Sequence, residues 1–151
     1  MSQGTLSQNT TAHSALGSLS DNTSASAGVA LAGRILLSVI FLLSGFSKVA
    51  DPSAMLGYIG SAGLPFPQLA LIVAIAVEIG GSLLLILGYR TRLVALVMAV
   101  FTLATALAFH NHLADQNQFI HFFKNIAMTG GLLQVVAFGA GRFSLDARRR
   151  G

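Results

Sequence analysis

Residues 69–109, LALIVAIAVEIGGSLLLILGYRTRLVALVMAVFTLATALAF, decide the fold class of this chain. They hold two apolar runs, Leu69 to Leu87 and Leu93 to Phe109, separated by a short connection built on GYRT. A helix of about 20 residues crosses the roughly 30 Å hydrocarbon core of a bilayer. Because backbone groups in lipid must bond within their own segment, both runs are predicted to be transmembrane helices. The short connection makes them antiparallel neighbours.

Two further apolar runs flank this pair, from Val29 to Val49 and from Phe119 to Phe138. The composition agrees, because 54% of the 151 residues are hydrophobic and only 9% are charged, a balance outside the range of soluble domains. The sequence therefore predicts an all-α fold, a membrane-embedded four-helix bundle. Within the proline-containing connection of residues 51–67, the segment from Ala54 to Ile59 is expected to form a short interfacial helix.

The chain divides into three predicted parts. Residues 1–26 are rich in Ser, Thr, Asn, Gln and Gly and are expected to be a disordered polar tail. Residues 27–141 form the four-helix transmembrane domain, and residues 142–151 form a basic C-terminal tail. No basic segment precedes the first apolar run, so a cleaved secretory signal is not expected.

The orientation in the membrane follows from the Lys and Arg residues near the ends of the spans. One side carries six of them: Arg90, Arg92, Arg142, Arg148, Arg149 and Arg150. The other side carries Lys48 and Lys124. This asymmetry predicts that both termini are cytoplasmic. It also accounts for the net charge of +4, so we expect the bilayer, and no nucleic acid, as the partner of the basic residues.

Glu78 lies at the centre of the second apolar run. Inserting an acidic residue at the middle of a membrane helix costs roughly 2.5–3.5 kcal/mol. The side chain should therefore be protonated, paired with a cation, or facing a wet cavity. Two interpretations remain open, a structural ion pair that fixes the bundle and a proton carrier or hydrogen-bond partner for a bound ligand.

The first apolar run carries a stripe of residues at helical spacing: Arg34, Ser38, Phe41, Gly45 and Lys48. Spacings of three and four keep them on one face, and the two cations should turn that face toward the bundle. We expect the long side chain of Arg34 to pair with Glu78. Lys48, at the other end of the stripe, would either face the bundle in the same way or extend to the membrane interface.

The fourth run and its approach carry the remaining polar candidates. Lys124, with Asn125 beside it, would extend outward or hold an anionic or carbonyl ligand near Glu78. His110 and His121 stand at the outer ends of the third and fourth runs. They would serve as haem or metal ligands or as a proton relay, or would simply be solvated. We predict no metal site.

The absence of cysteine excludes disulfides, thiol redox relays, iron–sulfur clusters and thiolate zinc sites. No catalytic Ser/His/Asp set or phosphate-binding loop is present either, so soluble-style hydrolytic or phosphoryl chemistry has no support. Any redox role would have to use a cofactor that the protein binds without covalent attachment.

Several stretches in order resemble the DoxX family of small four-helix bacterial membrane proteins. They are AGRILLSVIFLLSGFSKV (residues 32–49), GLP (63–65), VEIGGSLLLILGYRTR (77–92), FTLATALAFH (101–110) and FFKNIAMTGGLL (122–133). The resemblance implies a multi-pass protein of the bacterial inner membrane. It also implies that Arg34, Lys48, Glu78, Lys124 and Asn125, which occupy motif positions of the family, line a shared pocket.

The resemblance further implies an association with quinones or oxidoreductases. Under this hypothesis the bundle binds a quinone in its outer half, Glu78 carries protons, Lys124 polarises a carbonyl, and a redox partner subunit carries the electrons. The alternative is a non-enzymatic membrane component, either a small-solute permease or a scaffold or assembly subunit. Whether the protein is an enzyme, and whether it forms a homo-oligomer, stays open at this level.

Overall fold

The computed structural model describes residues 4–149, with side chains from residue 24 onward, and all regular structure in that part is helical. The elements are α1 (Gly4–Ala50), α2 (Pro52–Ser61), α3 (Pro67–Ile75), η1 (Ala76–Gly80), α4 (Gly81–Leu87), α5 (Thr91–Phe109), α6 (Gln116–Phe138) and α7 (Leu145–Arg148). η1 is a turn of π-helix, and α3, η1 and α4 follow one another without a break. Together they form one span.

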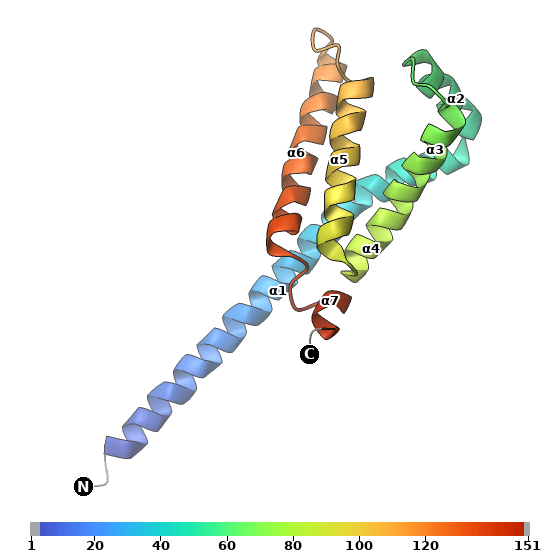
Figure 1. Cartoon of the computed structure of the whole chain (residues 1–151). Coiled ribbons are helices and arrows are strands. Elements are labelled where there is room, and N and C mark those ends of the chain that lie inside the picture. The colour runs from blue at the N-terminus through green and yellow to red at the C-terminus, as the bar shows by residue number, and fades with distance from the viewer. Residues whose placement is uncertain (1–3, 150–151) are drawn as a thin grey trace.

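The helices form two arms joined along α1 (Figure 1). α5 and α6 run antiparallel and closely packed in one arm, and α3, η1 and α4 form the other. α1 packs against α3, η1 and α4 and also contacts α6. The short helix α2 folds back beside α3 at the end where α1 finishes, and α7 lies beside the turn between α4 and α5 at the opposite end.

Three of the predicted spans are confirmed in length and composition. Ser24–Ala50, Pro67–Leu87 and Thr91–Phe109 are each long and apolar enough to cross a bilayer. α6 stands where the fourth span is predicted, and its 23 residues reach about 34 Å. Its polar residues, which include Lys124, Asn125 and Gln134, lower its mean hydropathy, and it is not among the helices that length and composition alone identify as spans in the described residues.

Large apolar side chains lie on the surface of the protein, as expected where the surroundings are lipid. Large apolar residues such as Leu36, Leu69 and Leu107 are more than half exposed, whereas soluble monomers rarely show such extensive apolar surface. Many buried residues are small or polar, and one tightly packed cluster holds Phe41, Leu85, Ala95, Met98, Ala99 and Leu132. Small residues allow helices to approach closely, which stabilises their packing in a bilayer.

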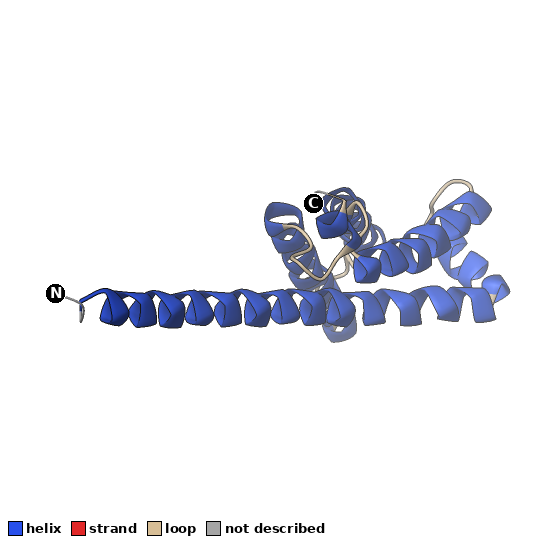
Figure 2. Cartoon of the chain, turned by 90° about the horizontal axis from the view of Figure 1, so that it is seen from below, coloured by secondary structure: helices blue, strands red, loops and turns tan. Residues whose placement is uncertain are grey.

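The first helix is longer than the sequence analysis expected. α1 continues from the predicted span back to Gly4, through residues expected to form a disordered tail, and its N-terminal part projects away from the bundle (Figure 2). No proline occurs before Pro52, so nothing interrupts the hydrogen-bond ladder. Because each residue added to an existing helix gains one hydrogen bond, the span can propagate the helix into this polar segment.

The short helix predicted between the first two spans is confirmed as α2. Its N-terminus is capped by Asp51, whose carboxylate accepts a hydrogen bond from the N–H of Ala54 at 3.0 Å. This bond, with a second from the Ser53 hydroxyl, holds the pKa of Asp51 below its ordinary value.

The turn between α4 and α5 is fixed by contacts with α1 and the C-terminal segment. Gly88 has φ +70°, and a Cβ there would lie 2.4 Å from Ser144 Cβ and 2.5 Å from a guanidinium nitrogen of Arg34. The Asp146 carboxylate accepts hydrogen bonds from the N–H groups of Arg90 and Thr91 and from the Thr91 hydroxyl, at 2.7–2.8 Å. It therefore caps the N-terminus of α5, which has no side-chain cap of its own.

α1 packs against the second span in a fixed antiparallel register. The Arg34 guanidinium donates to Leu85 O, and nearer the other end Gly45 faces Ile79. A Cβ at Gly45 would lie 2.6 Å from Ile79 Cγ1 and 3.3 Å from Glu78 Cβ. Glycine at this position therefore lets α1 approach the π-turn.

Replacing Gly45 with alanine should force α1 and η1 apart and lower the thermal stability of the purified protein. Gly33→Ala is the matched control, because a Cβ at Gly33 on the same helix would meet nothing within 4 Å. Alanine has the higher helix propensity by about 1 kcal/mol, so the control should be neutral or slightly stabilising. Equal melting temperatures for the two variants, measured by heating before size-exclusion chromatography, would contradict the close contact.

Candidate functional site

Glu78 lies in the π-helical turn η1, in the middle of the second span. The residue is 5% exposed, so its carboxylate is withdrawn from the lipid side of the helix. π-turns are rare insertions that occur frequently at functional sites. Sequence reasoning identified the residue but not the turn, because the apolar pattern around it is that of an ordinary span.

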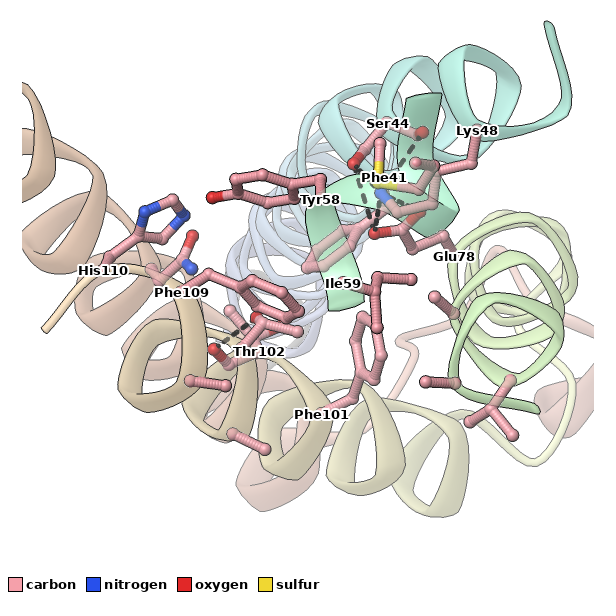
Figure 3. A pocket seen from close by; sticks show the side chains of 18 of the residues that line it. Phe41, Ser44, Lys48, Tyr58, Ile59, Glu78, Phe101, Thr102, Phe109 and His110 are labelled. Atoms are coloured by element: carbon pink, nitrogen blue, oxygen red, sulfur yellow. Dashed lines mark hydrogen bonds and ion pairs between the residues drawn. The ribbon is translucent and has the colours of Figure 1, made fainter. Parts of the chain in front are cut away.

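The cation that pairs with Glu78 is Lys48. Its ammonium nitrogen lies 2.9 Å from Oε2 and 3.0 Å from Oε1 of the carboxylate. Ser44, one helical turn before Lys48, accepts a hydrogen bond from the ammonium at 2.8 Å and donates its hydroxyl to Glu78 Oε1 at 3.1 Å. The three side chains close a triangle between α1 and η1 (Figure 3), and Oε2 has no partner besides the ammonium among the described residues.

The predicted pair of Arg34 and Glu78 is wrong. Arg34 is 1% exposed, and its guanidinium donates to the carbonyl oxygens of Leu85 at 2.9 Å and Ile86 at 3.1 Å, and to that of Phe143. The helices are antiparallel, so Arg34 meets the C-terminal end of the second span while Lys48, about 21 Å further along α1, meets its middle. Arg34 therefore donates hydrogen bonds to the last carbonyl groups of the second span, which have no partner within their own helix. It takes no part in the pocket.

A cavity of about 520 Å³ adjoins the ion pair, between the two arms of the bundle. Its polar lining consists of Ser44, Lys48, Glu78, Thr102, Thr105, His110, Lys124 and Asn125, together with the Tyr58 hydroxyl. The remaining walls are apolar or aromatic and include Phe41, Ile59, Phe101 and Phe109 (Figure 3). The volume lies within the range of small-molecule sites, which combine such walls with a few polar groups.

Asn125 is a further buried polar residue of this cavity, besides Glu78 and Thr102. The residue is 7% exposed, yet its side-chain amide makes no hydrogen bond to any described residue, and only its backbone carbonyl accepts one, from Thr129. The amide lines the cavity and is not among the fully buried side-chain groups without a partner in the described part of the chain. It can therefore hydrogen-bond to a ligand or water in the cavity.

The outer residues predicted as ligand contacts divide into two groups. His110 and Lys124 line the cavity, whereas His121 does not. His121 instead lies beside both: its ring stacks on His110 at 5.1 Å between centroids, and its Nδ1 is 3.1 Å from Lys124 Nζ. No group of three metal-ligating side chains occurs among the described residues.

Two stacked aromatic residues line the cavity at the end where α1 finishes and α2 begins. Tyr58 of α2 stacks on Phe109 at the end of α5, with ring centroids 5.3 Å apart, and the neighbouring Ile59 is buried. Sequence reasoning did not assign these residues to the site. The sequence of the short interfacial helix gave no sign that Tyr58 and Ile59 would line a cavity, because only the fold brings α2 beside α5.

The fold and the site define a small, helical integral membrane protein with a polar pocket between its helices. The family model of DoxX matches residues 29–111, which contain the ion pair and most of the pocket.

Two inner membrane proteins of Escherichia coli strain K12 are similar over most of their length. YqjF is 34% identical, with 77% of this chain and 88% of the relative covered, and YphA is 34% identical, with 78% and 88% covered. The chain belongs to the DoxX family. No solved structure matches it.

The ion pair predicts a difference between single and double substitutions. Lys48→Met leaves Glu78 buried without a cation, and breaking a buried pair from one side costs about 3–5 kcal/mol. Lys48→Met with Glu78→Gln removes both charges and should recover most of the stability. Thermal denaturation in detergent would measure this, and a double variant no more stable than Lys48→Met would show that the pair does not hold the helices.

Proposed function

We propose that this protein crosses a bacterial inner membrane four times, with both termini in the cytoplasm. We further propose that it binds a quinone in the pocket beside Glu78, as a small subunit of a membrane oxidoreductase. The observation that carries the ligand proposal is the cavity itself, which has aromatic walls and a polar end made of a buried ion pair and the amide of Asn125.

α6 as a fourth span is supported by its packing. It lies antiparallel against α5 over most of its length (Figure 1), and Asn125, one of the polar residues that lower its hydropathy, is buried at the pocket. The orientation is supported by the arginines of the α4–α5 turn and of α7, which lie at the same end of the bundle. The inner membrane is the location named for both E. coli relatives.

The chemistry of the pocket suits a ring with carbonyl oxygens. Phe101 and Phe109 offer aromatic faces for stacking. Lys124 and the Asn125 amide provide hydrogen-bond donors for a carbonyl, and a bound quinone would supply the redox chemistry that a cysteine-free chain lacks. Glu78, held by Lys48 and Ser44, would accept or release the proton that accompanies reduction or oxidation of such a ring.

The same contacts are also compatible with a non-enzymatic function. If the ion pair serves only to hold α1 against η1, the protein is a non-enzymatic component, either a scaffold subunit or a permease for small solutes. The electron partner and any homo-oligomer would then have no role in the function of the pocket. The two readings differ in whether an apolar ring ligand stays bound when the protein is purified.

The topology can be tested with single cysteines, because the natural chain has none. Leu113→Cys, in the connection between α5 and α6, should react with a membrane-impermeant maleimide in intact cells whose outer membrane has been permeabilised. Ser24→Cys and Arg148→Cys should react only after the inner membrane is opened. Labelling of Arg148→Cys and Leu113→Cys under the same condition would exclude a spanning α6.

For the ligand, the protein should be extracted with its native lipids into polymer-bounded discs and analysed for quinone by mass spectrometry. Wild-type protein should retain quinone well above discs from cells without the protein. Loss of the polar partners in Lys48→Met/Glu78→Gln or in Asn125→Leu should weaken retention about 5- to 100-fold, the equivalent of one to a few lost hydrogen bonds.

Arg90→Gln serves as the control, because Arg90 is exposed and lies outside the pocket. Its quinone content should equal that of the wild type. Quinone at the background level in wild-type discs would remove the proposal in favour of the scaffold or permease. Retention unchanged in folded Asn125→Leu and Lys48→Met/Glu78→Gln proteins would show that the polar end of the pocket does not bind the ligand.

A further inference from the structure

A second cavity, of about 400 Å³, lies at the opposite end of the bundle from the outer mouth of the pocket. It is formed where α5 begins, where α6 ends and where the chain turns back toward α7. Arg92 and Arg142 line it together with Phe138, Gly141 and Asp146. None of these residues belongs to the pocket beside Glu78.

Two guanidinium groups and one carboxylate line this cavity, so its net charge is positive. Arg92 and Arg142 are exposed, and neither forms an ion pair with any described residue. The one carboxylate in the lining, that of Asp146, is engaged by the N–H groups of Arg90 and Thr91 and by the Thr91 hydroxyl. Two guanidinium groups therefore remain available, and each can bind a phosphate through two parallel hydrogen bonds.

The backbone beside these arginines also has free donors. Gly139 and Gly141 have φ of +81° and +75°, which takes the chain out of helical geometry directly after α6. The N–H groups of Gly141 and Arg142 donate no hydrogen bond to any described residue. Successive N–H groups that lack an acceptor favour an anion nearby.

The position of the cavity indicates where the anion comes from. Phe138, at the C-terminal end of α6, is 80% exposed and lines the cavity, and Phe143 next to Arg142 is 53% exposed. An exposed phenyl ring at a span end is stabilised by contact with acyl chains, which places the adjacent arginines near the level of the headgroups. A phosphate bound by Arg92 and Arg142 is therefore placed where it can belong to a lipid whose acyl chains run past Phe138. A soluble anion would gain nothing from this apolar contact.

We propose that this cavity binds the phosphate of an anionic phospholipid of the leaflet that faces it. The two guanidinium groups hold the phosphate, and Phe138 contacts the glycerol and upper acyl region. Basic pockets between membrane helices on the cytoplasmic side are known to bind such headgroups. The bound lipid would join the start of α5 to the C-terminal segment, which Asp146 already connects by hydrogen bonds. The proposal is independent of any ligand in the pocket beside Glu78.

The test uses full-length protein reconstituted into phosphatidylcholine vesicles with a trace of spin-labelled lipid. Electron paramagnetic resonance reports the fraction of labelled lipid immobilised by the protein. Wild-type protein should immobilise spin-labelled phosphatidylglycerol in preference to spin-labelled phosphatidylcholine. Because the two guanidinium groups hold the phosphate, Arg92→Gln/Arg142→Gln should lower the ratio of the two association constants roughly fivefold or more.

The matched control is Arg90→Gln/Arg148→Gln, which removes two exposed charges at the same end of the molecule but outside the cavity. It should keep most of the preference, and circular dichroism should show that both double variants are folded. An equal loss in both would mean that only the overall positive charge attracts the lipid and would overturn the site. The same conclusion follows from no loss in Arg92→Gln/Arg142→Gln.

A soluble anion is distinguished by adding inorganic phosphate at constant ionic strength. If the cavity binds lipid, millimolar phosphate should leave the preference for phosphatidylglycerol unchanged. Complete loss of the preference at that concentration would identify a site for free phosphate and overturn the lipid assignment.

Discussion

Polar groups in the hydrocarbon of a membrane must find partners within the protein, and this requirement governs the contact of α1 with the second span. Along this contact the polar residues of α1 each meet a group of the opposite helix: Arg34 the carbonyls of Leu85 and Ile86, Ser38 the carbonyl of Ser82, and Lys48 the carboxylate of Glu78. An unsatisfied group in lipid costs several kcal/mol, so a shift of register by one turn would leave several groups unpaired at once. The polar stripe therefore fixes how the two helices pack, although it contributes little apolar contact.

The two ends of this contact have different roles. At the end near residues 85–92 the Arg34 guanidinium, the glycine at 88 and the Asp146 carboxylate satisfy helix termini and join the C-terminal segment to the bundle. These groups bond to one another, although Arg34 Nε has no hydrogen-bond partner among the described residues. At the other end the arms separate around a cavity, which the Asn125 amide lines. The ion pair and the Asn125 amide thus face space that a ligand could occupy, whereas the Arg34 guanidinium and the Asp146 carboxylate bond to groups of the protein itself.

The π-turn connects the packing to the site. An inserted residue in a span shifts the side chains that follow it around the helix axis, and such turns are frequent at functional sites. Here the turn contains Glu78 and lies against Gly45 of α1. The carboxylate is thereby held between the ammonium of Lys48 and the cavity, the position that proton exchange with a bound ring would need.

The sequence by itself determined that this protein lies in lipid, where three of its spans are, and which residues cannot face lipid. Hydropathy and charge act locally, so a window of about 20 residues is enough to recognise them. Glu78, Lys48, Lys124, Asn125 and His110 were found in this way and do line one cavity. Only the tertiary structure decided which of them touch. Whether Lys48 or Arg34 meets Glu78 depends on the antiparallel register of two helices, and the part played by Tyr58 depends on where α2 folds back. Both are set by contacts between residues far apart in the chain, which no local pattern records.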